Sequence, residues 1–114
     1  MTVFILKSEN EKEKVTDEKQ IVQHETSGVD GVFFIEHEGL RVAGLSYVRE
    51  SESLIILQHT MVRDVARGTG AGKKMVAYAV QWARKNNVKL NAECSYAAAV
   101  LEKNKAWHDV LFNE

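Results

Sequence analysis

The sequence contains no proline and only one cysteine, Cys94. A single cysteine excludes an internal disulfide and leaves no thiolate cluster for zinc. No apolar run approaches the roughly 18 residues that a membrane-spanning helix needs, and the apolar start at 1–6 is shorter than the core of a signal peptide. We therefore expect a cytoplasmic protein without membrane contact. The histidines at 24, 37 and 108 show no metal-ligand spacing, so we also expect no metal site.

The chain has little net charge, −1 over 114 residues, but the charge is unevenly distributed. Residues 59–86 contain six lysine and arginine side chains and one acid, Asp64, so the rest of the chain is acidic. A local cationic segment in a nearly neutral chain favours a small anionic ligand over a nucleic acid, which usually contacts a broad basic surface. We therefore expect a small anionic partner and no nucleic acid.

The sequence pattern predicts one domain at 20–114, preceded by an extension at 1–19 whose order the sequence does not define. Residues 1–7 have the composition of a short apolar strand. The charged segment at 7–20 is interpreted as a solvated linker or an exposed helix. The chain contains no internal repeat, so one hydrophobic core should account for the whole domain.

β-Branched, aromatic and alternating residues predict four strands in the first half of the domain, at 21–25, 32–35, 40–49 and 54–62. Short turns separate them. One of these turns contains Gly28 and Gly31, and the next is Glu38-Gly39. Strands joined by such short turns pair with their neighbours in antiparallel fashion. We therefore predict an antiparallel meander up to residue 62.

The second half of the domain alternates between helix and strand. A helix should begin at Ala71 and end at Asn86-Asn87, because apolar residues recur there at spacings of three and four. Its predicted core face consists of Met75, Val76, Ala79, Val80 and Ala83. A strand at 88–93 and a helix from Ser95 to about Lys103 follow. A right-handed crossover would make strands 54–62 and 88–93 parallel neighbours, so the fold class is α+β with a mixed sheet.

The segment 67–72, Arg-Gly-Thr-Gly-Ala-Gly, lies between a strand and a helix and is a candidate phosphate-binding loop. The Walker template fails because Lys73 stands where a glycine is required. The dinucleotide fingerprint G-x-G-x-x-G fails at the same position. A third template, Gln/Arg-x-x-Gly-x-Gly/Ala, fits with Arg67, Gly70 and Gly72. Glycines permit close approach of the backbone to an anion, and the N–H groups at the helix start point toward it.

This loop resembles the coenzyme A pyrophosphate site of the GNAT N-acetyltransferases. The resemblance covers roughly residues 20–112. Four motifs occur in the order found in the minimal YjdJ-like branch of that superfamily: His59-Thr60, the loop 67–74, Cys94-Ser95-Tyr96, and Leu101 to Asn104 with Trp107. The resemblance implies a truncated GNAT-like fold and an acetyl-coenzyme A-dependent N-acetyltransferase acting on a small-molecule or protein amine.

The resemblance also implies which residues form the site. The cofactor-binding residues would be Val62, Arg63, Arg67, Gly68, Thr69, Gly70, Ala71, Gly72, Lys73, Lys103 and Asn104. Val62 would contribute a main-chain group that polarises the thioester carbonyl. The catalytic candidates are His59, Cys94 and Tyr96.

The chemistry of the three catalytic candidates leaves several roles open. His59 can act as the base that deprotonates the amine, or it can be a histidine hydrogen-bonded within the sheet. Cys94 can form an acyl-enzyme, protonate the leaving thiolate, or only line the pocket. Tyr96 can donate a proton or serve packing alone. We expect His59 and Cys94 to flank the thioester carbon.

Larger GNAT proteins place two helices between the first two strands to grip the acceptor, whereas the turn at 28–31 leaves no room for them. The branch often has proline two residues before the cysteine, where this chain has Ala92. The first difference leaves the acceptor and the oligomeric state undefined. It also keeps an alternative open, namely a coenzyme A-binding or protein-interaction module on the same fold with little catalysis.

Overall fold

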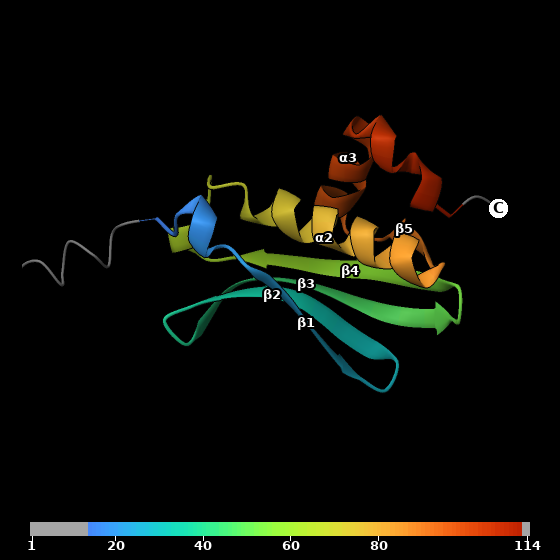
Figure 1. The fold of residues 1–114 in the computed structure, drawn as a ribbon, viewed down its shortest axis with the longest axis horizontal. Helices are drawn as coiled ribbons and strands as arrows, with labels where there is room; N and C mark the ends of the chain where they lie inside the picture. The colour runs from blue at the N-terminus through green and yellow to red at the C-terminus, as the bar shows by residue number, and fades with distance from the viewer. Residues whose placement is uncertain (1–13, 113–114) are drawn as a thin grey trace, which may run out of the picture.

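The computed structural model describes residues 14–112 as a five-stranded sheet with helices on one face (Figure 1). The strands are β1 (Val22–Ser27), β2 (Asp30–His37), β3 (Leu40–Ser51), β4 (Leu54–Val62) and β5 (Lys89–Ala92), in the order of the sequence. The helices are α2 (Ala71–Asn86) and α3 (Ser95–Lys103), and three short 3-10 segments complete the chain: η1 (Asp17–Lys19), η2 (Asp64–Ala66) and η3 (Lys105–Val110). The strand expected at 1–7 lies outside the described residues.

The four predicted strands of the meander are confirmed, and β4 has the expected bounds. β1 to β4 pair in antiparallel fashion and β4 pairs with β5 in parallel, so the mixed sheet and its crossover are also confirmed. Gly28 and Gly39 occupy the hairpin turns with positive φ angles of 62° and 79°, a region that glycine enters without steric cost. The structure thus matches the predicted α+β fold class.

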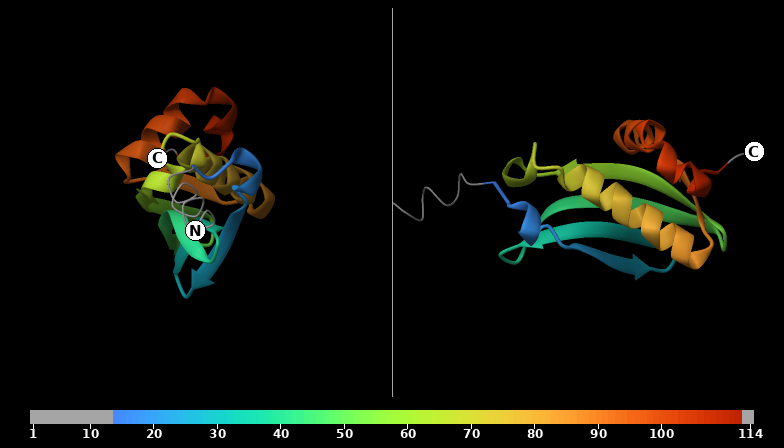
Figure 2. Two further views of the ribbon diagram at one scale, coloured as in Figure 1. Left: turned by 90° about the vertical axis from the view of Figure 1, so that its left-hand side faces the viewer. Right: turned by 45° about the horizontal axis from the view of Figure 1, so that its top comes forward.

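Helix α2 lies along one face of the sheet and forms the centre of the core (Figures 1 and 2). Its five predicted core residues, from Met75 to Ala83, are all buried, as are Ala71 and Gly72. Asn87 ends the helix in the left-handed conformation, with φ 56°. Facing strand residues such as Phe33, Leu45 and Leu57 are fully buried under it. None of the helices described in residues 14–112 is long and apolar enough to cross a membrane.

The segment before β1 is more closely packed than the charge pattern suggests. Val15 and Gln20 are buried, at 2% and 6% exposure, although the sequence predicted a solvated linker or an exposed helix over 7–20. The Val15 N–H donates to the carbonyl of Val65 at 2.7 Å, and the Lys14 ammonium donates to the carbonyl of Asp64. The expectation is wrong at these positions because two residues among many charges suffice to anchor the segment on η2.

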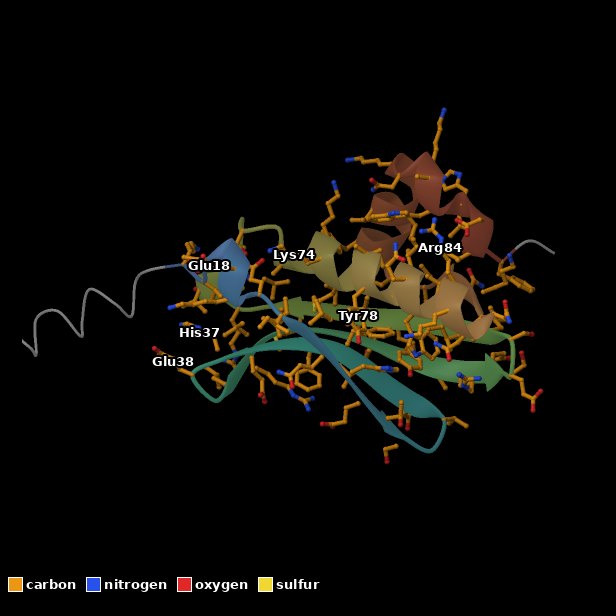
Figure 3. All side chains as sticks on the ribbon, viewed as in Figure 1. Glu18, His37, Glu38, Lys74, Tyr78 and Arg84 are labelled. Carbon is orange, nitrogen blue, oxygen red and sulfur yellow. The ribbon has the colours of Figure 1, made fainter. Side chains whose placement is uncertain are left out.

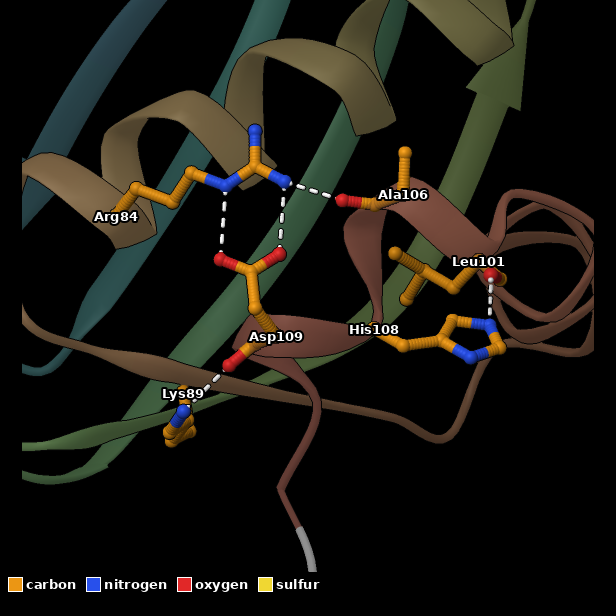
Figure 4. Close-up of polar contacts among 6 residues, drawn as sticks. All are labelled: Arg84, Lys89, Leu101, Ala106, His108 and Asp109. Atoms are coloured by element: carbon orange, nitrogen blue, oxygen red, sulfur yellow. Dashed lines mark hydrogen bonds and ion pairs between the residues drawn. The ribbon is translucent and has the colours of Figure 1, made fainter.

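A clamp of polar contacts holds the C-terminal segment against α2 and β5 (Figure 4). The Arg84 guanidinium donates two hydrogen bonds to the Asp109 carboxylate, at 2.9 and 2.7 Å. This pairing raises the pKa of Arg84 and lowers that of Asp109. Further along, the Phe112 N–H donates to the carbonyl of Leu90 at 2.9 Å, and Asn91 Oδ1 accepts from the Ala92 N–H at 2.9 Å. On the outer edge of β5, the Leu90 carbonyl and the Ala92 N–H therefore both have hydrogen-bond partners.

An aromatic cluster connects β1, β2 and β3 to the outer side of α2. The His24 imidazole stacks on Phe33 with ring centroids 4.4 Å apart and lies edge-on to Trp82 at 5.2 Å. Its Nε2 shares a hydrogen bond of 2.6 Å with the Tyr47 hydroxyl. Burial lowers the pKa of His24, and the positive charge of Arg49 lowers it further. The fold therefore favours the neutral imidazole.

The lowered pKa of His24 predicts that acidification destabilises the fold. Because the folded-state pKa lies below the ordinary value of 6.5, the contribution of neutral His24 is complete above that pH and is lost as the pH falls below it. Thermal melts between pH 7.5 and 5 should show a larger fall in melting temperature for the wild type than for His24→Gln. Equal slopes for the two proteins would contradict this assignment.

Candidate functional site

A β-bulge in β4 decides which side chains reach the helical face of the sheet. In the β3–β4 pairing Leu57 lies opposite Tyr47 and His59 lies opposite Ser46, so Gln58 is the extra residue. Side chains alternate between faces along a strand, and an extra residue reverses that alternation. Before the bulge Leu57 points toward α2. After it Thr60 points that way, while His59 points to the exposed face.

The two parallel strands part immediately after this bulge. Their pairing extends from Leu54 and Lys89 to Leu57 and Ala92 and then stops. The N–H groups of Glu93 and Cys94 both donate to the Leu57 carbonyl, at 2.8 and 3.3 Å, which ends the ladder. Beyond this point β4 continues to Val62 without β5 beside it, which opens a slot between the strands.

The main chain of β4 presents hydrogen-bonding groups to this slot. The Arg63 N–H donates to the Val42 carbonyl at 2.8 Å, so Arg63 and Val42 form a hydrogen-bonded antiparallel pair. Such pairs alternate with pairs whose main-chain groups point away from the partner strand. By that alternation the N–H groups of Val62 and Thr60 point away from β3. The Val62 N–H therefore faces the slot, as its predicted role in polarising a carbonyl requires.

The glycine loop joins η2 to α2 and contains two residues with positive φ. These are Gly68 at 76° and Gly70 at 86°, and the latter caps the helix. The first hydrogen bond of α2 is donated by the Lys74 N–H to the Gly70 carbonyl, at 3.0 Å. The preceding N–H groups have no acceptor within the helix because the helix starts there, and with the helix dipole they favour an anion.

A cavity of about 470 Å³ connects the slot to this loop. The residues lining it come from four places in the sequence: Thr60 and Val62 of β4, Ala66 of η2, the loop and helix start at Arg67, Gly68, Gly70, Ala71 and Gly72, and Tyr96 of α3. The loop end is basic, and Lys74 lies there on the first turn of α2 (Figure 3). The cavity thus extends from the glycine loop, where basic residues gather, to the slot between the strands.

The segment before β1 supports the loop from behind. Buried Gln20 donates from Nε2 to the Thr69 hydroxyl at 2.5 Å and to the Val15 carbonyl at 3.2 Å. The Thr69 hydroxyl in turn donates to the carbonyl of Ala66 at 2.5 Å. The Thr69 side chain therefore points into the protein. These hydrogen bonds keep it away from the cavity, although the sequence predicted Thr69 as a cofactor-binding residue.

Cys94 lies on the helical face of the slot, next to Thr60. Its Sγ is 3.1 Å from the Thr60 hydroxyl, and the residue occupies the N-cap position of α3. Burial by itself raises the pKa of the Cys94 thiol, but the Thr60 hydroxyl and the N–H groups of Ala97, Tyr96 and Thr60 outweigh burial, so the pKa is lowered. A cysteine with such neighbours carries more thiolate character than a buried packing residue.

Tyr96 closes the cavity on the side of α3. A β-carbon at Gly72 would collide with the Tyr96 hydroxyl and ring, so the tyrosine lies directly on the first turn of α2. The side chain is still 44% exposed. Gly72 is thus required for the close approach of Tyr96, and the tyrosine hydroxyl is near both the loop and the slot.

His59 borders the same slot from the opposite face of the sheet. The residue is exposed, and the hydroxyl of Ser46 donates to its carbonyl at 3.5 Å. The structure therefore brings Cys94 and Tyr96 to the helical face and leaves His59 on the exposed face. Their predicted catalytic roles stay predictions, but the two faces give them different access to the slot.

Three of the predicted cofactor residues, Arg63, Lys103 and Asn104, do not line the cavity. The Arg63 Nε donates to the Arg41 carbonyl at 2.9 Å, which directs the side chain away from the cavity. Lys103 is the last residue of α3 and Asn104 caps the helix, roughly 13 Å from its start. The Asn104 amide donates to the Val100 carbonyl at 2.6 Å. Lys73 is exposed at the loop, and Arg67 makes an exposed ion pair with Asp64 at 3.3 Å.

Sequence reasoning missed Thr60 as a site residue, although it contacts Cys94 and lines the cavity. The available signal was its position beside His59, yet its orientation depends on the bulge at Gln58. Within residues 14–112, no three histidine, cysteine, aspartate or glutamate side chains are grouped closely enough to hold a metal ion.

Comparison with known proteins gives two kinds of match. Residues 32–110 match the model of the family described as GCN5-related N-acetyl-transferase. The solution structure of a GCN5-like protein from Staphylococcus aureus is similar at 31% identity, with a TM-score of 0.64, covering 84% of this chain and 91% of that one. The ribosomal-protein-alanine N-acetyltransferase of Brucella melitensis biovar Abortus 2308 shares the fold alone, at 13% identity and a TM-score of 0.55, covering 68% and 64%. No protein of curated function matches the sequence.

Proposed function

Because the chain belongs to the GCN5-related N-acetyltransferase family, whose members are acyltransferases, we propose that it transfers the acetyl group of acetyl-coenzyme A to an amine. The observation that carries the proposal is the cavity that joins a basic glycine loop to the slot between β4 and β5. The pyrophosphate suits the loop, where the N–H groups of a helix start and a cationic surface favour an anion. The pantetheine arm suits the slot.

The main chain of β4 supplies the group that the chemistry needs most. An amine attacks the carbonyl carbon of the thioester, and negative charge develops on the carbonyl oxygen. The Val62 N–H, which points into the slot, donates to that oxygen in this proposal. The carbon–nitrogen bond forms, the carbon–sulfur bond breaks, and the electron pair leaves with the sulfur.

Two proton transfers complete the reaction, one on each face of the sheet. His59 on the exposed face accepts the proton that the ammonium group of the substrate must lose before attack. On the helical face, Cys94 or Tyr96 donates a proton to the departing thiolate. After attack the nitrogen loses a second proton, which restores the group that protonated the thiolate. The net products are the acetylated amine, free coenzyme A and one proton released from His59 to solvent, so atoms and charge balance.

The lowered pKa of the Cys94 thiol keeps a covalent route open. A thiolate at this place can attack the thioester itself and carry the acetyl group to the amine as an acyl-enzyme. The same thiol can instead act only as the proton donor for coenzyme A. The two routes differ in whether an acetylated protein accumulates without acceptor.

Incubation with acetyl-coenzyme A and no amine should distinguish the routes. The covalent route predicts a mass increase of one acetyl group on the wild type, which Cys94→Ser removes and Cys94→Ala removes without weakening cofactor binding. The direct route predicts no adduct and a loss on the order of 100-fold in rate for His59→Ala. Intact-protein mass spectrometry and turnover measurements give both results.

One observation supports the alternative function, a coenzyme A-binding module without catalysis. The turn between β1 and β2 is short, so the exposed face has no acceptor helices in the described chain. Wild-type rates at background in the presence of tight cofactor binding would favour it. So would unchanged rates in both His59→Ala and Cys94→Ala. The cytoplasmic location and the YjdJ-like branch expected from the sequence stay predictions.

A further inference from the structure

The exposed face of the slot has its own set of side chains. The bulge at Gln58 turns His59 and Met61 to this face, where Met61 is 44% exposed. No helix of residues 14–112 covers this side of the sheet, which lies below the strands in Figure 1. A substrate can therefore reach His59 directly from solvent, without passing the loop or α3.

Glu93 borders the slot on the same face. Along 89–94 the buried and exposed residues alternate: Leu90 and Ala92 pack toward α2, whereas Lys89, Asn91 and Glu93 are exposed. The hydrogen bond of 2.8 Å from the Glu93 N–H to the Leu57 carbonyl fixes its backbone where the strands part. Glu93 directly follows Ala92, whose register partner is Leu57, so it lies at the end of β5 near the part of β4 that contains His59.

Arg41 and Arg63, two cationic side chains on this face of the sheet, are engaged with other partners. The Arg41 guanidinium forms an ion pair with Glu25 at 2.8 Å and lies over the Phe34 ring, with its carbon 3.8 Å from the ring centroid. Arg63 donates to the Arg41 carbonyl. Neither arginine is paired with the Glu93 carboxylate, which is exposed at the end of β5 on the same face of the sheet as His59.

We propose that Glu93 is a specificity-determining residue that holds the ammonium group of a protonated primary alkylamine at the exposed face of the slot. This inference rests on the proposed acetyl transfer and adds the acceptor class to it. The alkylammonium donates to the Glu93 carboxylate and is placed beside His59. One proton passes to His59, the neutral amine nitrogen attacks the thioester, and Glu93 keeps its charge throughout.

The test compares 1,4-diaminobutane, which is protonated at pH 7.5, with 4-methylaniline, which is neutral there. The variants are Glu93→Gln, Glu93→Asp and Glu52→Gln, the last being a matched exposed carboxylate in the β3–β4 turn. Glu93→Gln should raise the KM for the diamine roughly five- to tenfold, with kcat and the KM for acetyl-coenzyme A unchanged. Glu93→Asp should recover part of the loss, and Glu52→Gln should match the wild type.

The aniline is the internal control, since Glu93→Gln should leave its KM unchanged. Equal KM values for the diamine in wild type and Glu93→Gln, or an equal change for both amines, would overturn the inference while leaving acetyl transfer intact. If neither amine is turned over, NMR titration of the protein with coenzyme A present decides. Diamine-dependent shifts of the His59 imidazole signals that Glu93→Gln removes support the inference, and their absence contradicts it. Failure of the wild type to bind acetyl-coenzyme A would instead contradict the proposed function.

Discussion

Gly70→Glu should abolish measurable binding of acetyl-coenzyme A. Gly70 has φ 86°, where a residue with a β-carbon costs about 1–2 kcal/mol, so the loop would be strained or rearranged. The glutamate would also place a negative charge at the N-terminus of α2, where the proposed pyrophosphate binds. Calorimetric titration should show that the affinity for acetyl-coenzyme A falls by more than about 100-fold. Charge repulsion and the loss of N–H contacts to the pyrophosphate both contribute to this fall.

Gly28→Glu is the matched control for that experiment. Gly28 also has positive φ, 62°, and a β-carbon there would meet no atom within 4 Å, as is true of Gly70. It lies in the β1–β2 turn at the opposite end of the sheet from the loop (Figure 1). The control should show similar backbone strain and unchanged affinity. Equal affinity in both variants would show that the loop does not bind the cofactor.

Val80→Asp should leave the protein largely unfolded at room temperature. Val80 is 0% exposed on the face of α2 that packs on the sheet. A carboxylate there has no partner, and burying it costs on the order of 4 kcal/mol or more, against a total stability of about 5–15 kcal/mol for a domain. Circular dichroism and a thermal melt measure the loss.

Gln81→Asp tests whether the effect arises from burial or from helix propensity. Gln81 is the next residue of α2 and is exposed, so its substitution introduces the same side chain without burying it. Its melting temperature should stay within a few degrees of the wild type. If both variants melt alike, the core face of α2 has been assigned incorrectly.

Much of this fold was predictable because its signals are local. The spacing from Met75 to Ala83 identified the buried face of α2, and the glycine loop predicted the candidate site that the cavity adjoins. Short turns made antiparallel pairing of the first four strands nearly unavoidable. The handedness of crossovers then made β4 and β5 parallel neighbours.

What escaped prediction depends on packing between distant segments. No composition signal indicates that Gln58 is a bulge, because a bulge is defined by its partner strand and not by its own side chain. The orientations of His59 and Thr60 follow from it. Val15 and Gln20 stand among charged residues, and only contacts some fifty residues away along the chain, at Val65 and Thr69, account for their burial.

The outer edge of β5 has a consequence for solubility. An edge strand with free N–H and C=O groups is a template onto which another chain can add a strand, and this is a common route to aggregation. Here the Leu90 carbonyl already accepts from Phe112, and the Ala92 N–H already donates to the side chain of Asn91. An intruding strand would have to displace both bonds before it could pair. The strand that borders the proposed reaction site is thereby protected from the intermolecular pairing to which its position at the sheet edge would otherwise expose it.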